Sequence, residues 1–175
     1  MKKTILALLL SLSLIFLFAF SSTASETETS PVAYTDESGN QRIDYADGSY
    51  TIITPAVKVT DTEVETGTDS VARVAILTTT GEVSATNYAE NGNVNWVYTL
   101  IGLFQYKPGI SCVCKRSDYK VSITGAYWDF SDPSNTYMDN AAYGYGIFKH
   151  TILFVTNRTI TVDLRIRCDT YGEFY

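Results

Sequence analysis

Histidine is the scarcest reactive side chain in this sequence: only His150 occurs, with three cysteines and four prolines in 175 residues. A Ser-His-Asp or Cys-His catalytic site would have to use that one residue. The sequence also contains no G-x-S-x-G, H-E-x-x-H or glycine-rich phosphate-binding pattern, and no histidines or further cysteines at the spacing of a metal site. These absences predict no catalytic residue, no metal and no cofactor, and they favour a function other than catalysis.

Charged residues make up only 18% of the chain, and basic residues are in the minority. Loss of Lys2 and Lys3 with the leader described below leaves 11 basic and 19 acidic residues, so the formal net charge moves from −6 to −8. Nucleic acid partners are disfavoured because phosphate-binding proteins concentrate Lys and Arg on one face. Ten acidic residues lie within 25–70, against two basic ones. Because residues 25–47 combine this charge with almost no apolar run, the sequence predicts an acidic, flexible arm there.

The longest apolar run stands at the beginning of the chain. Lys2 and Lys3 precede an apolar stretch over residues 5–20, and small residues follow it up to Ala24. This order is typical of a signal peptide, so residues 1–24 are predicted to be removed after Ala24; retention as a membrane anchor is the alternative. No second apolar segment of about 20 residues occurs. We therefore expect a secreted, extracellular protein with no stable membrane insertion once the leader is cleaved.

Short runs of β-type residues separated by turn residues fill the chain from residue 48 onward, and no window shows a 3.6-residue period. Residues 160–168 alternate apolar and polar side chains, which predicts a strand with one buried face. The run 152–155 is expected to pair with it through a tight turn at Asn157-Arg158. Further strands are predicted at 50–53, 57–60, 71–77, 94–106, 110–114, 119–127 and 143–148. This pattern predicts a single all-β domain over 48–175, an antiparallel β-sandwich of immunoglobulin-like or similar type.

All three cysteines, Cys112, Cys114 and Cys168, lie in the exported part of the chain, where a disulfide can persist. Cys112 and Cys114 are two residues apart on a predicted strand and therefore share a face, so only one of them can pair with Cys168. The alternation of 160–168 places Cys168 on the buried face. We expect one disulfide, Cys112–Cys168 or, as the alternative, Cys114–Cys168, with the third thiol free.

Tyrosine outnumbers phenylalanine after the leader, with thirteen Tyr against five Phe. Tyr and Trp pair an apolar ring with a polar end, so they suit surfaces that meet a ligand. Residues 96–106 are apolar on both faces, which indicates either a strand covered on each side or one exposed face. The glycines of 143–146 admit a ligand or a neighbouring aromatic ring. We predict a binding patch for a glycan or a protein surface, formed by Trp96, Tyr98, Trp128, Tyr143 and Tyr145; ordinary sheet packing of these rings is the alternative.

Acidic side chains offer one route to catalysis. Asp129, Asp132 and Asp139 fall within one stretch of the sequence, and a carboxylate pair across a cleft can hydrolyse a glycosidic bond. The same stretch holds Asn135 and Asn140, which add oxygen ligands of the kind that bind calcium, although without EF-hand spacing. A polar turn is the simpler interpretation because Asp-Pro and Ser-Asn begin chain reversals.

The C-terminal part contains a set of framework features: Phe104-Gln105-Tyr106 followed by Ser111-Cys112, Trp128, Asn140-Ala141-Ala142 before Gly146-Ile147-Phe148, and the terminal segment from Val162 to Phe174. In these features the chain from residue 103 onward resembles a group of small secreted proteins of unknown function from clostridia-like Gram-positive bacteria. The resemblance covers under half of the chain and implies a secreted framework with a cysteine pair but no activity. Cys114 departs from the pattern.

The sequence therefore predicts a secreted binding or surface-interaction module rather than an enzyme. The alternative is a small secreted carbohydrate- or cell-wall-active enzyme that uses acidic residues in a groove. A third interpretation is a structural or inhibitor-like protein that acts through its shape. Aromatic-rich β-sandwiches present flat faces and end loops to their partners, which favours the first of these.

Overall fold

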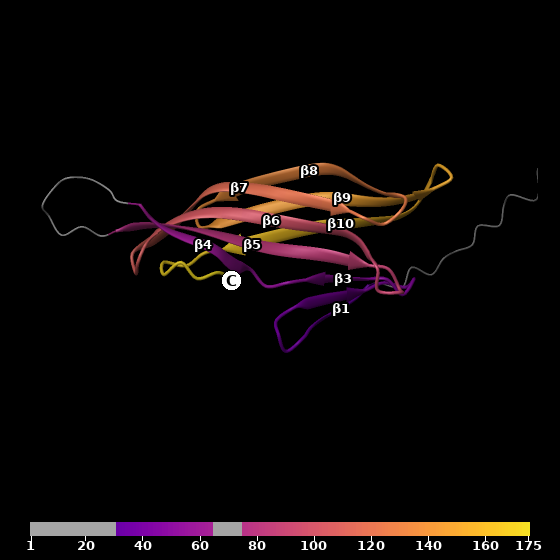
Figure 1. The fold of residues 1–175 in the computed structure, drawn as a ribbon, viewed down its shortest axis with the longest axis horizontal. Coiled ribbons are helices and arrows are strands. Elements are labelled where there is room, and N and C mark those ends of the chain that lie inside the picture. Colours follow the sequence, from indigo (N-terminus) through magenta and orange to yellow (C-terminus); the bar gives the residue numbers. More distant parts are fainter. Residues whose placement is uncertain (1–30, 65–74) are drawn as a thin grey trace, which may run out of the picture.

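The computed structural model describes residues 31–64 and 75–175, and within these ranges it contains ten strands and no helix (Figure 1). The predicted leader, residues 1–24, lies outside the described residues, as does most of the predicted strand 71–77. No helix of the described ranges has the length and apolarity that a membrane span requires. The strands are β1 (Val32–Thr35), β2 (Gln41–Asp44), β3 (Tyr50–Ile53), β4 (Val57–Val64), β5 (Ile76–Tyr88), β6 (Val94–Lys107), β7 (Ser111–Ile123), β8 (Trp128–Met138), β9 (Ala141–Ile152) and β10 (Val155–Arg167).

Two antiparallel sheets form a sandwich, which confirms the predicted all-β, single-domain architecture. The larger sheet runs β1-β2-β3-β5-β6-β7, and β4 also pairs with β5, because β3 occupies only residues 85–88 of that long strand. The smaller sheet runs β10-β9-β8. In Figure 1 the strands β5 to β7 lie in front, with β9 and β10 behind them.

The core lies between β5 and β6 of one sheet and β9 and β10 of the other. Every second side chain of β6 is buried from Trp96 to Tyr106, and every second side chain of β10 from Ile160 to Ile166. This follows from the strand period of two, which places alternate residues on one face. The opposite face of β6, with Val97 and Leu103, is half-buried. The second layer therefore covers one face of β6, although both faces are apolar.

Aromatic rings fill much of this core. The Trp96 ring stacks on Phe148 with 3.8 Å between ring centroids, and Phe130 packs on Phe148 at 4.9 Å. Two glycines of β9 make room for such rings: a Cβ on Gly146 would overlap the Phe130 ring, and one on Gly144 would lie 2.7 Å from the Tyr98 hydroxyl. The glycines of the Tyr-Gly-Tyr-Gly motif thus admit rings from within the fold, one of the two alternatives that the sequence left open.

The N-terminal part differs from the predicted arm over 25–47. Residues 32–44 form the β1–β2 hairpin, which extends the larger sheet through β3, while residues 25–30 lie outside the described residues. The acidic residues here close turns: the Asp36 carboxylate accepts hydrogen bonds from the backbone N–H groups of Ser38 and Asn40, each at 2.9 Å. Charge in this segment therefore serves local turn geometry, which a composition argument misses.

The β9–β10 hairpin also differs from its prediction. Its turn is Leu153-Phe154, because Ile152 pairs directly with Val155, and the predicted turn residues Asn157 and Arg158 lie in β10 beside a β-bulge. The prediction was wrong because Leu-Phe carries no turn signal, whereas Asn commonly does.

Two other boundaries change. The segments predicted at 110–114 and 119–127 are joined in one continuous strand, β7, which ends at Ile123, so residues 124–127 lie outside it. The polar stretch predicted as a turn around Asp129 to Asn135 is the edge strand β8. β8 is one edge of the smaller sheet and carries mostly exposed residues, so its sequence lacks the apolar alternation that marks a buried strand.

Candidate functional site

The turn between β9 and β10 presents four consecutive apolar side chains to solvent. Phe154 is fully exposed and Leu153 is 86% exposed, and they are flanked by exposed Ile152 and Val155. We call these four residues the apolar tip. Figure 1 shows the turn projecting at one end of the sandwich, beyond the ends of the neighbouring strands. Single exposed apolar residues are common on protein surfaces, but a contiguous group at a projecting position is a candidate interaction site.

The backbone of the apolar tip adopts a conformation that its residues disfavour. Leu153 and Phe154 both have positive φ, 48° and 67°, in a two-residue turn. This is the geometry of a type I′ turn, for which Asn-Gly is the preferred sequence. A residue with a Cβ in the left-handed region costs about 1–2 kcal/mol. The fold alone would be served better by other residues, so it does not explain why Leu and Phe stand here.

Three neighbouring side chains that combine aromatic and polar character lie behind the apolar tip. Tyr127 is exposed, and its carbonyl oxygen accepts a hydrogen bond from the Thr151 N–H at 2.9 Å. Its ring lies 6.2 Å from His150, which in turn lies 5.1 Å from Trp128. The His150 Nδ1 is hydrogen-bonded to the Asn157 side chain at 2.9 Å. We call Tyr127, Trp128 and His150 the aromatic collar.

Arg158 ties the N-terminal hairpins to this end of the molecule. Its guanidinium donates hydrogen bonds to the Asp47 carboxylate and the Ser49 hydroxyl, and it stacks over the Tyr45 ring at 4.1 Å. Burial alone would raise the pKa of Asp47, but hydrogen bonds from Ser49 and the positive charge of Arg158 outweigh it and hold that pKa below its ordinary value. The carboxylate therefore stays charged and keeps Arg158 in place.

The five predicted patch residues do not form one surface. Trp96 and Tyr98 are completely buried between the sheets, and Trp128 is half-buried, with its ring edge-on to Trp96 at 6.3 Å. Tyr143 and Tyr145 alternate with the buried residues of β9 and so lie on the outer face of the smaller sheet, where they are half-buried. Trp96 and Tyr98 point inward because their alternate positions on β6 face the second layer. Only Trp128 belongs to the surroundings of the apolar tip.

Asp129 and Asp139, two of the three carboxylates considered for catalysis, are far apart. Asp129 lies near the start of β8 and Asp139 follows its end, a separation of ten residues along one strand. At about 3.3 Å per residue, this is roughly 30 Å. Glycosidases hold their carboxylate pair about 5–10 Å apart. Asp129 and Asp139 therefore cannot work on one glycosidic bond, and Asp132 occupies a positive-φ position within β8.

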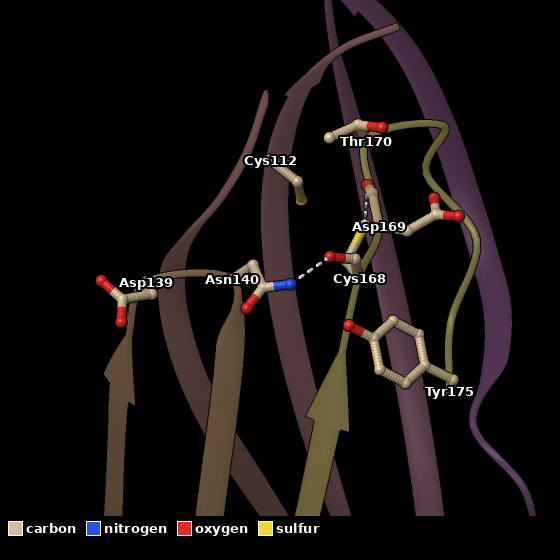
Figure 2. A pocket seen from close by; sticks show the side chains of 7 residues that line it. All are labelled: Cys112, Asp139, Asn140, Cys168, Asp169, Thr170 and Tyr175. Carbon is tan, nitrogen blue, oxygen red and sulfur yellow. Dashed lines mark hydrogen bonds between the residues drawn. The ribbon is translucent and has the colours of Figure 1, made fainter. Parts of the chain in front are cut away.

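Two of the cysteines, Cys112 and Cys168, line a pocket of about 380 Å³ at the opposite end of the sandwich (Figure 2). All three cysteines are free thiols in the structure. Cys112 on β7 and Cys168 after β10 are neighbours, and the interaction of their thiols lowers the pKa of Cys112 while raising that of Cys168. The Cys168 thiol donates to the Asp169 carbonyl oxygen at 3.4 Å (Figure 2). Cys114 is buried away from this pair: its thiol donates to the Arg116 carbonyl oxygen at 3.4 Å, and burial raises its pKa to about 11.

The sequence pattern does not predict the apolar tip. The run 152–155 reads as part of a buried strand, because Ile, Leu, Phe and Val have high β propensity. The Thr-Asn-Arg-Thr segment that follows is a signal that could have predicted the tip. Four polar residues do not continue a buried strand, so they indicate that the apolar run 152–155 lies at the end of the buried region.

Comparison of the chain with protein-family models, with curated proteins and with solved structures found no match in any of the three.

Proposed function

We propose that the protein is a secreted surface-interaction module that contacts its target through the apolar tip of the β9–β10 hairpin. The observation that carries this proposal is the pair Leu153 and Phe154, which are almost completely exposed and stand in left-handed backbone conformations. Both features reduce the stability of the isolated fold, and residues held at such a cost indicate a role outside the fold.

Secretion belongs to the same proposal. The charged start, apolar stretch and small residues of 1–24 would direct export and be removed after Ala24. Outside the cell, the neighbouring thiols of Cys112 and Cys168 would be oxidised to a disulfide. Two thiols lose two protons and two electrons, and the electrons pass to the disulfide of a thiol-exchange partner that is reduced to a dithiol. Cys114 remains the free thiol.

A photo-crosslinking experiment tests the contact site. Phe154 is replaced by p-benzoylphenylalanine in the chain that begins at Ser25, and the protein is illuminated on cell envelopes of the producing organism. The matched control carries the same group at Ile110, an exposed apolar residue of the β6–β7 turn at the opposite end. We expect a crosslinked product from position 154 and none from position 110. Equal or absent crosslinking from both positions would exclude the apolar tip as the contact site.

A further inference from the structure

The chemistry of the apolar tip and of the layers behind it identifies the target further. We infer that the tip inserts into the interface of a lipid bilayer whose headgroups carry no net charge. The contact is peripheral and reversible, and the hairpin does not cross the bilayer. This inference rests on the proposed function. Three observations carry it: the shape of the tip, the length of its uncharged segment and the charge pattern behind it.

The tip is convex, and its side chains extend outward from a two-residue turn. A protein partner would need a pocket shaped for Leu153 and Phe154 together, whereas the acyl boundary of a bilayer accepts any small apolar projection. A turn of two residues also leaves few unpaired backbone groups, because Ile152 and Val155 close the hairpin ladder directly behind it. Unpaired backbone N–H and C=O groups are what keeps irregular loops out of an apolar layer.

The uncharged part of the hairpin has the length of an interfacial insertion. Seven consecutive residues, from Thr151 to Asn157, carry no charge, and Lys149 and Arg158 are the first charged residues on the two strands. From Thr151 to the turn the strand rises about three residues, which is roughly 10 Å. Amphipathic segments that lie at a bilayer surface bury about 5–10 Å of their depth. A charge within this stretch of the hairpin would oppose insertion, and residues 151–157 contain none.

The aromatic collar lies where the headgroups would be. Tyr127, Trp128 and His150 combine a ring with a polar atom, and Trp and Tyr concentrate at the membrane–water boundary for that reason. Lys149 adjoins the collar, and its long stem can carry the ammonium group outward to water. The order from the turn inward is thus apolar, aromatic and polar, then charged, which is the order of a bilayer from its acyl region to water.

The charges behind the collar are of both signs, which decides the kind of lipid. Lys149 lies opposite Asp129 in the β8–β9 register, and Arg158 is bound to Asp47. This end therefore offers no basic patch for anionic headgroups, and the acidic chain as a whole would be repelled by them. Phosphatidylcholine vesicles, which carry no net charge, are the matching probe.

Vesicle sedimentation tests the inference directly. The chain from Ser25 onward, which retains every described strand, is mixed with phosphatidylcholine vesicles and with vesicles that contain phosphatidylglycerol. We expect binding to phosphatidylcholine that changes little with salt, and weaker binding to the anionic vesicles at low salt. The double variant Leu153→Asn/Phe154→Gly, which has the preferred type I′ turn sequence, should fold and bind at least tenfold more weakly, whereas Ile110→Thr should bind as the unaltered protein does. Equal binding by the double variant would overturn the inference.

A fluorescent reporter gives the depth of insertion. The variant Phe154→Trp should shift its emission to shorter wavelength on phosphatidylcholine vesicles and be quenched most by lipids brominated near the headgroup; Ile110→Trp should do neither. If the protein does not bind vesicles but still crosslinks from position 154 to a protein or polysaccharide of the envelope, the lipid inference fails while the proposed function stands. Absence of both signals would overturn the two together.

Discussion

Tyr98 carries a hydroxyl into the sandwich core without a hydrogen-bond partner among the described residues. A buried polar group without a partner costs about 1–3 kcal/mol. The variant Tyr98→Phe removes that group and keeps the ring, which packs against Tyr119 at 5.8 Å and Phe130 at 5.9 Å. We expect a gain in the free energy of unfolding of about 0.5–1 kcal/mol, measured by urea denaturation. A loss larger than about 1 kcal/mol would reveal a partner for the hydroxyl.

The burial of Tyr98 also predicts that the stability of the fold depends on pH in the alkaline range. Burial raises the pKa of Tyr98 to about 12, above the ordinary value of 10.0 for the unfolded chain. Below pH 10 the ring is neutral in both states, so its contribution does not vary. Between pH 10 and about 12 only the unfolded chain ionises, and stability therefore falls as pH rises. Urea denaturation of the unaltered protein and of Tyr98→Phe at pH 8 and 11 should show the smaller loss for Tyr98→Phe. Equal losses would mean that Tyr98 ionises freely in the folded protein.

At the scale of the element, the residues of the β9–β10 turn lower the stability of the hairpin. Leu153→Asn/Phe154→Gly relieves two left-handed residues and removes side chains that are exposed in the isolated protein. We expect stabilisation by at least about 1–2 kcal/mol, because Phe154→Gly alone removes a cost of that size. For a domain of this size, that raises Tm by a few degrees, measurable by differential scanning calorimetry. A lower Tm would show that the tip contributes contacts to the fold.

Arg158 joins elements that are far apart in the sequence, so its replacement should loosen one part of the molecule and leave the rest intact. In Arg158→Ala, the bonds to Asp47 and Ser49 and the stacking on Tyr45 are lost. Hydrogen exchange of β1 to β3 should accelerate, while the central strands β5, β6 and β9 stay protected. Arg165→Ala, at an exposed position of the same strand, is the matched control. Uniform acceleration across all strands would show that Arg158 supports the whole fold.

How far the sequence predicts these elements depends on burial. Strands with a buried face, such as 160–168 and 94–106, show alternation or strong apolar character and were placed within a few residues of β10 and β6. The edge strand β8 and the hairpin β1–β2 have mostly exposed or half-buried side chains, so nothing in their residue pattern marks them as strands. The exposure of the apolar tip was not predicted for the opposite reason. Its residues have the composition of a buried strand, and only the chain reversal at Leu153 exposes them.

At the scale of the whole molecule, the two ends of the sandwich have different chemistry. The end formed by the β9–β10 turn carries the apolar tip, whereas the other end carries Cys112 and Cys168 beside a polar pocket with Asp139 and Asp169. Residues of both sheets meet at each end, so contacts there hold the layers together. A target bound at the tip would thus meet the sandwich at the end farthest from the thiols.

The cysteine end supplies the last prediction, because Cys112 belongs to the larger sheet and Cys168 follows the last strand of the smaller one. A disulfide between them would close a loop of about 57 residues and stabilise the fold by about 4 kcal/mol in the chain-entropy model. We expect one free thiol per secreted chain under denaturing, non-reducing conditions, and a fall in Tm of roughly 10 °C on reduction. Cys112→Ser should match the reduced protein, whereas Cys114→Ser should keep the higher Tm of the oxidised one, because its thiol faces the Arg116 carbonyl. Three free thiols in the secreted chain, or a Tm that reduction leaves unchanged, would show that the two sheets are joined by packing and hydrogen bonds without this bridge.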